Sequence, residues 1–178
     1  MAQRETVLLA EAVRYALGSA TLVDPRQLTA STPCPDWNLG DLLRHLADSI
    51  AVLDLLITGT PPPPAAAADP VELLRDRAAG LLWTSFTAED RTHYVVPVIA
   101  VGAIEITVHA WDVAVACARP RRIPSCLAGP LLGLAARLIP ERDGLFGPPL
   151  PTPPCANPGD KLIAWLGRDP GTCYRRVA

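Results

Sequence analysis

The chain has 178 residues, enough for one domain of ordinary size, and 49% of them are hydrophobic, which excludes wholesale disorder. Its formal net charge of −2 gives no sign of the basic surface that nucleic-acid-binding proteins carry. The longest apolar runs are too short to cross a membrane, and charges at Arg4, Glu5, Glu11 and Arg14 interrupt the first amphipathic segment, as they do not in a signal peptide. We therefore expect one cytoplasmic domain, residues 1–178, that binds neither nucleic acid nor membrane.

The spacing of apolar residues predicts an all-α fold whose helices follow in this order: 4–18, 39–57, 70–82, 102–118, 130–138 and 160–165. Gly18 is expected to end the first helix and Gly59 the second. Asn38 and Asp41 have the spacing of a capping box at the start of the second helix, and Pro70 suits the first position of the third.

The remaining segments are predicted as connections. Residues 61–64 and the tail from Gly147 to Asp160 are rich in proline, which disfavours helix. The segment 94–99 is β-branched but short, and Pro97 weakens it as a strand. The five cysteines are odd in number and include no C-x-x-C, so they predict neither a disulfide framework nor a cysteine-based zinc site.

Two of the three histidines lie on these helices among apolar neighbours. His109 follows Glu105 by four residues, which turns an α-helix by roughly 400° and leaves both side chains on one face. Their Cβ atoms should be roughly 5–6 Å apart, a spacing by which one helix offers two ligands to one metal ion. His45 lies on the second helix, which can pack against the fourth in a bundle.

Two imidazoles and one carboxylate form a common catalytic zinc set that leaves one coordination position open. Ni²⁺ or Fe²⁺ could use the same set, so the ligands alone do not select the metal. Glu105 could instead pair with His109 inside the helix, and a histidine on an apolar face is often an ordinary core residue. The apolar surroundings of Glu105 favour the metal, because a buried carboxylate is costly unless it is paired or metal-bound.

Four more residues are candidates for the site. Cys34, just before the second helix, could be a fourth ligand, a nucleophile activated by the helix dipole, or a small buried residue. Trp37 could line a substrate site or anchor the helix start. Asp112 could orient a ligand histidine by accepting a hydrogen bond from its ring, or face solvent. His93 could act as a general acid or base if its loop reaches the metal, or lie at the surface.

A resemblance to a known family rests on three segments in the same order. Residues 32–47 read T-P-C-P-D-W-N-L-G-D-L-L-R-H-L-A, close to a T-P-C-x-x-W-x-x-x-D-L-x-x-H-L pattern. Residues 105–112 read E-I-T-V-H-A-W-D, similar to an E-x-x-x-H-x-W-D helix, and residues 146–170 contain F-G-P-P-L-P and W-L-G-R-D-P. The chain resembles the DinB-like superfamily, in the actinobacterial branch that includes the N-terminal domain of mycothiol-dependent maleylpyruvate isomerase.

This resemblance implies an up-and-down four-helix bundle with a metal site at one end, and it places the ligands at His45, Glu105 and His109. Members use zinc or another divalent metal to activate a thiol cofactor, which in actinobacteria is mycothiol. The resemblance therefore implies a metal-bound thiol or water, and thiol addition to an electrophilic or carbonyl substrate with isomerisation or transfer as the outcome. The isomerase has an additional C-terminal domain, for which residues 1–178 leave no room, so thiol use stays open here.

Three alternatives remain beside a thiol-dependent transferase or isomerase. The first is a thiol-independent metal-dependent isomerase, cyclase or hydrolase of natural-product biosynthesis. The second is a non-enzymatic small-molecule binding or resistance protein in which the metal stabilises the bundle. The third is a bundle without metal. Apolar helix faces also make a homodimer an expectation.

Overall fold

The computed structural model describes residues 2–64, 69–87, 96–119, 121–139 and 146–173, and over these ranges the chain is helical without a β-sheet. The six α-helices are listed in chain order: α1 (Ala2–Ala20), α2 (Leu39–Thr58), α3 (Pro70–Thr87), α4 (Val96–Ala116), α5 (Ser125–Leu138) and α6 (Pro158–Trp165). Short 3-10 turns cover Pro25–Gln27 and Pro170–Cys173. The predicted all-α class is confirmed.

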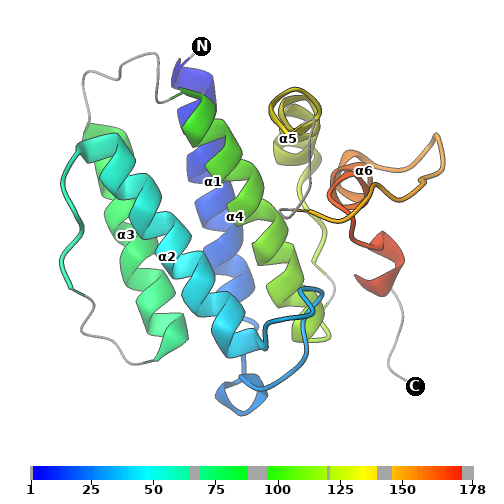
Figure 1. Ribbon diagram of the computed structural model, residues 1–178, viewed down its shortest axis with the longest axis horizontal. Helices are drawn as coiled ribbons and strands as arrows, with labels where there is room; N and C mark the ends of the chain where they lie inside the picture. The colour runs from blue at the N-terminus through cyan, green and yellow to red at the C-terminus, as the bar shows by residue number, and fades with distance from the viewer. Residues whose placement is uncertain (1, 65–68, 88–95, 120, 140–145, 174–178) are drawn as a thin grey trace.

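The first four helices form a bundle in which α1 packs on α3 and α4, and α2 packs on the same two helices. Figure 1 shows α1 and α4 running downward and α2 and α3 running upward. The four-helix bundle is confirmed. Its helices run down, up, up and down, so the neighbours α2 and α3 are parallel and the direction does not alternate from each helix to the next. After α2 the chain therefore turns back along α3, where Pro63 accepts a hydrogen bond from Arg77.

The last two helices lie outside the bundle, as the right-hand side of Figure 1 shows. α5 packs on α4 and α1, and α6 packs on α5. The proline-rich tail is attached by a backbone hydrogen bond from Leu150 to Ala164. Gly167 ends α6 with a φ of +78°, and a Cβ there would lie 2.7 Å from the backbone of Gly147. Only glycine permits this close approach, which directs the chain back toward the bundle at Arg168.

Several helix bounds differ from the predicted ones. α1 continues two residues past Gly18, and α4 begins at Val96, so the described part of the weak candidate strand is helical. Pro97 is tolerated because the first turn of a helix has amide groups without intrahelical acceptors. α5 begins before Pro130 and α6 begins after Asn157, whose side chain caps the amide of Asp160. The predicted bounds place these prolines at or before the start of a helix, whereas the chain is already helical at each of them.

The core lies between the bundle helices, and α4 is its central member. Its apolar segment Pro97–Ala116 is long enough to cross a membrane, but 78% of that segment is buried within the protein. It packs on α1, α2 and α5, which explains why it is apolar on most sides. The largest fully buried side chains come from several helices: Leu9, Leu39, Leu42, Leu43, Leu46, Ile50, Leu74, Leu81, Ile99, Ile104, Ile106 and Leu131.

The start of α2 carries the predicted capping box. The Asn38 side chain accepts from the amide of Asp41 at 3.0 Å, and the Asp41 carboxylate accepts from the amide of Asn38. Asn38→Ala is expected to lower the free energy of unfolding by about 1 kcal/mol, measured by urea denaturation. Asp36→Ala, an exposed position that caps no helix, is the control. Equal stability of the two variants would contradict the role of the cap.

Candidate metal centre

The three predicted ligands meet at the interface between α2 and α4. His45 comes from α2, and Glu105 and His109 come from one face of α4. One ligand atom of each residue lies within 4.8 Å of those of the other two. Nε2 of His45 lies 3.2 Å from Oε1 of Glu105. Helical spacing brings two of the ligands together, and the packing of α2 on α4 brings the third.

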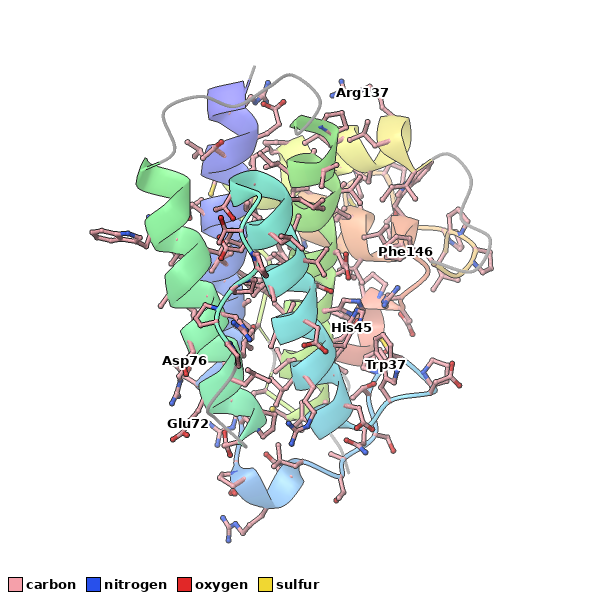
Figure 2. All side chains as sticks on the ribbon, turned by 60° about the vertical axis from the view of Figure 1, so that its left-hand side comes forward. Trp37, His45, Glu72, Asp76, Arg137 and Phe146 are labelled. Carbon is pink, nitrogen blue, oxygen red and sulfur yellow. The ribbon has the colours of Figure 1, made fainter. Side chains whose placement is uncertain are left out.

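The two imidazoles are held by an aromatic wall. Their ring centroids are 5.0 Å apart at an interplanar angle of 89°, so His45 and His109 present different edges to the space between them. The Trp37 ring lies 4.2 Å from the His45 ring and 5.8 Å from the His109 ring. Figure 2 shows Trp37 and His45 close together beside the lower half of α2. Trp37 therefore restricts both ligand rings and does not only anchor the helix start.

The Glu105 carboxylate is held in its ionised form. Burial alone would raise the pKa of this carboxyl, but hydrogen bonds to His45 and Ser49 and the nearby His109 outweigh it, so the pKa lies below its usual value. The Ser49 hydroxyl donates to Oε1 of Glu105 at 2.7 Å. Ser49 was not among the predicted site residues, although it follows His45 by the same four residues that separate Glu105 from His109. A carboxylate with these neighbours suits a cation.

Behind His109 lies a buried carboxylate. Oδ2 of Asp112 is 3.2 Å from Nδ1 of His109, and the Asp112 side chain is fully buried. An ionised carboxylate only accepts hydrogen bonds, so Nδ1 of His109 donates to it, and in the neutral imidazole Nε2 on the other edge of the ring is the nitrogen that can bind a metal ion. The predicted orienting position of Asp112 is therefore the one observed, and the alternative that it faces solvent is wrong.

The Asp112 carboxylate is itself bound by Arg168, which follows α6. Nη2 of Arg168 lies 3.1 Å from Oδ2 of Asp112, and Nε lies 3.4 Å from Oδ1. Burial alone would lower the pKa of this guanidinium, but Asp112, together with Cys34, raises it. Arg168 was not among the predicted site residues. Its segment W-L-G-R-D-P was noted only as a family-like tail, and nothing local connects it to α4.

Cys34 lies on the same side of His109 as Asp112. Its Sγ is 3.4 Å from Oδ2 of Asp112, 3.4 Å from Nη2 of Arg168 and 3.8 Å from Nδ1 of His109. Burial, followed by the Asp112 charge, raises the pKa of this thiol to about 12, although Arg168 acts to lower it. Of the three alternatives for Cys34, the raised pKa favours a small buried residue over a nucleophile activated by the helix dipole. The ligand atoms of Cys34, His109 and Asp112 lie within 4.8 Å of one another, but the Arg168 guanidinium is already bonded to Asp112 and Cys34 there.

Cys34 is expected to resist alkylation in the native protein. With a pKa of about 12, its thiolate fraction at pH 8 is roughly a thousandfold below that of an ordinary thiol. Iodoacetamide at pH 8 should modify the exposed Cys126 and Cys155 and leave Cys34 unmodified, as peptide mass spectrometry would show. The urea-unfolded protein, in which Cys34 reacts, is the control. Reaction of native Cys34 at the rate of Cys126 would contradict the raised pKa.

His93, the last predicted candidate, lies outside the described residues. A general acid or base role for it stays a prediction.

A pocket of about 580 Å³ opens beside the ligands, between α2 and α4. Its polar lining comes from His45, Ser49 and Glu105 at the metal-ligand end, and from Asp48. The rest of the wall is apolar and extends along both helices to Leu138 of α5. A small molecule in this pocket would reach His45 and Glu105 directly.

Comparison with known proteins identifies the class of protein. The family model described as the mycothiol maleylpyruvate isomerase N-terminal domain matches residues 9–114. The chain belongs to this family. The matched region runs from α1 to α4 and contains the three predicted ligands, together with Asp112. Arg168 lies beyond it, in the part that follows α6.

Two proteins from Mycobacterium tuberculosis are similar to this chain, one from strain H37Rv and one from strain CDC 1551. Each is 27% identical over 156 residues, which is 80% of this chain and 85% of the relative, and each is described as an uncharacterized protein. No solved structure matches the chain significantly. The family and the arrangement of His45, Glu105 and His109 together indicate metal binding.

Proposed function

We propose that this protein is a metal-dependent enzyme of small-molecule metabolism that transfers a thiol to, or isomerises, an electrophilic or carbonyl-containing substrate. The observation that carries the proposal is the triad of His45, Glu105 and His109, whose ligand atoms lie within 4.8 Å of one another beside a pocket of about 580 Å³. Metabolic enzymes hold their reacting group at the edge of such a pocket.

The triad fits a divalent cation. Two neutral imidazoles and one ionised carboxylate are a donor set of catalytic zinc sites, so we propose Zn²⁺, with Ni²⁺ and Fe²⁺ as competitors in the test. The pKa of Glu105 lies below its usual value, which keeps this carboxylate ionised, and the contact of Nδ1 of His109 with Asp112 leaves Nε2 as the nitrogen that would ligate. A bound cation of this kind supplies Lewis acidity that favours thiolate over thiol near neutral pH.

The chain's own residues would position the reactants. Asp112 holds the His109 ring through Nδ1, and Trp37 packs on the His45 ring, so both ligands have fixed orientations. The pocket binds the body of the substrate next to Glu105 and His45. Because the pKa of Cys34 is raised to about 12, we assign the reacting thiol to a cofactor and not to this cysteine. The family description makes mycothiol the first cofactor to test.

The test has two stages. Metal analysis of the purified protein, followed by titration with Zn²⁺, Ni²⁺ and Fe²⁺, should give one bound ion per chain, and a protein that binds none of them would end the proposal. The loaded protein is then incubated with α,β-unsaturated carbonyl compounds with and without mycothiol. Turnover that requires mycothiol supports the thiol-dependent reaction. Turnover unaffected by mycothiol would favour the thiol-independent isomerase, cyclase or hydrolase.

A further inference from the structure

The wall of the pocket between α2 and α4 has an unusual distribution of charge. Among the described residues that line it, none is a lysine or arginine, and the two charged ones, Asp48 and Glu105, are both acidic. Arg168 is bonded to Asp112 on the Nδ1 side of His109 and does not line this pocket. None of these described lining residues would pair with the charge of an anionic substrate body.

The mouth of the same pocket is apolar. Four of the large hydrophobic side chains that the structure leaves exposed lie on its wall, and they come from three helices: Val52 and Leu56 from α2, Val98 from α4 and Leu138 from α5. Exposed apolar side chains that converge on one hollow mark a binding surface, whereas scattered ones do not. The apolar surface continues from this mouth to the ligands His45 and Glu105.

The length of the pocket sets the size of its occupant. Pro97 and Glu105 line it eight residues apart on α4, which at a rise of 1.5 Å per residue makes the pocket roughly 12 Å long. With a volume of about 580 Å³, it falls in the range of pockets that bury a drug-sized ligand.

We propose that the substrate of this site is an elongated, uncharged apolar molecule whose reactive head group lies at His45 and Glu105 and whose tail extends between Val52, Val98 and Leu138. This inference rests on the proposed function for the head group. Because the described lining offers no cationic side chain, it favours such a molecule over a small dicarboxylate. Selectivity comes from burial of the apolar tail and from the acidic residues of the pocket wall, Asp48 and Glu105, which repel a negative charge carried by the tail.

Three hydroxamic acids with the same metal-chelating head test the proposal on Zn²⁺-loaded protein by isothermal titration calorimetry. Acetohydroxamate reports the head group, octanohydroxamate adds an apolar tail, and suberic monohydroxamate has a tail of the same length that ends in a carboxylate. We expect octanohydroxamate to bind at least about 100-fold more tightly than acetohydroxamate, since each buried methylene contributes roughly threefold to fourfold. The suberic compound should lose most of that gain.

A matched pair of variants connects the tail to this pocket. Val52 on the pocket wall and Val7 on α1 away from it are exposed to nearly the same extent, 55% and 56%. Val52→Asp should weaken octanohydroxamate about tenfold and leave acetohydroxamate unchanged, because one apolar wall residue becomes charged. Val7→Asp should change neither affinity.

The outcomes separate the two proposals. Equal affinities for the octanoic and suberic compounds, or an unchanged octanohydroxamate affinity in Val52→Asp, would overturn the apolar-substrate inference. Failure of acetohydroxamate to bind would count against the metal centre instead. In that case, displacement of an apolar fluorescent dye from the metal-free protein by octanol and not by suberate would still support the inference, and equal displacement would overturn it.

Discussion

His45→Gln is expected to lower the affinity for Zn²⁺ by about 100- to 1000-fold and to leave the bundle folded. Structural zinc sites with four ligands bind with about 10–16 kcal/mol, so the loss of one ligand removes roughly 3–4 kcal/mol. His45 is a third exposed, so its replacement by a polar side chain leaves little cavity in the core. Competition with a chromogenic chelator gives the affinity, and circular dichroism checks the fold.

Asp48→Asn serves as the control for His45→Gln. Asp48 is exposed, lies on the same helix and lines the same pocket, but it is not one of the three residues that converge as ligands. Its replacement removes a negative charge near the site and should change the Zn²⁺ affinity less than tenfold, since exposed charges interact weakly through water. A His45→Gln protein that binds Zn²⁺ as tightly as Asp48→Asn would show that His45 is not a ligand.

Asp112→Asn is expected to destabilise the protein by about 3–5 kcal/mol and to lower its Zn²⁺ affinity by about 10- to 100-fold. The loss of charge leaves the Arg168 guanidinium, whose side chain is 11% exposed, without its anionic partner. It also weakens the hydrogen bond that holds Nδ1 of His109. Urea denaturation gives the stability, and chelator competition, far below the urea transition, gives the affinity.

The double variant Asp112→Asn, Arg168→Met separates positioning from folding. It removes both buried charges, so it should recover part of the stability that Asp112→Asn loses, while the Zn²⁺ affinity stays low because His109 still lacks its carboxylate. Asp24→Asn, in the exposed pair with Arg26, is the control and should leave the urea midpoint unchanged. Recovery of the Zn²⁺ affinity along with the stability would mean that Asp112 acts through the fold alone.

Local pattern was enough to predict the helices and the three ligands. The step of four residues from Glu105 to His109 is a property of any α-helix, and the apolar face around His45 required a partner helix. The Asn38–Asp41 capping box was equally readable, because both of its hydrogen bonds close within one helical turn. Three of the helix starts that failed, those of α4, α5 and α6, lie near prolines such as Pro97, whose effect depends on their position within a turn.

The sequence by itself therefore determined an all-α chain with two candidate ligands on one helix and a third on another, because helical periodicity is encoded in neighbouring residues. Only the tertiary structure decided what surrounds them. Arg168 meets Asp112 across 56 positions, and Cys34 meets Asp112 across 78. Its place before a helix left activation of the Cys34 thiol open, but the pKa of this thiol is raised, because it depends on burial and on that distant charge. Contacts between elements far apart in the chain leave no periodic trace, and so the apolar pocket and the parallel course of α2 and α3 could be found only in the folded molecule.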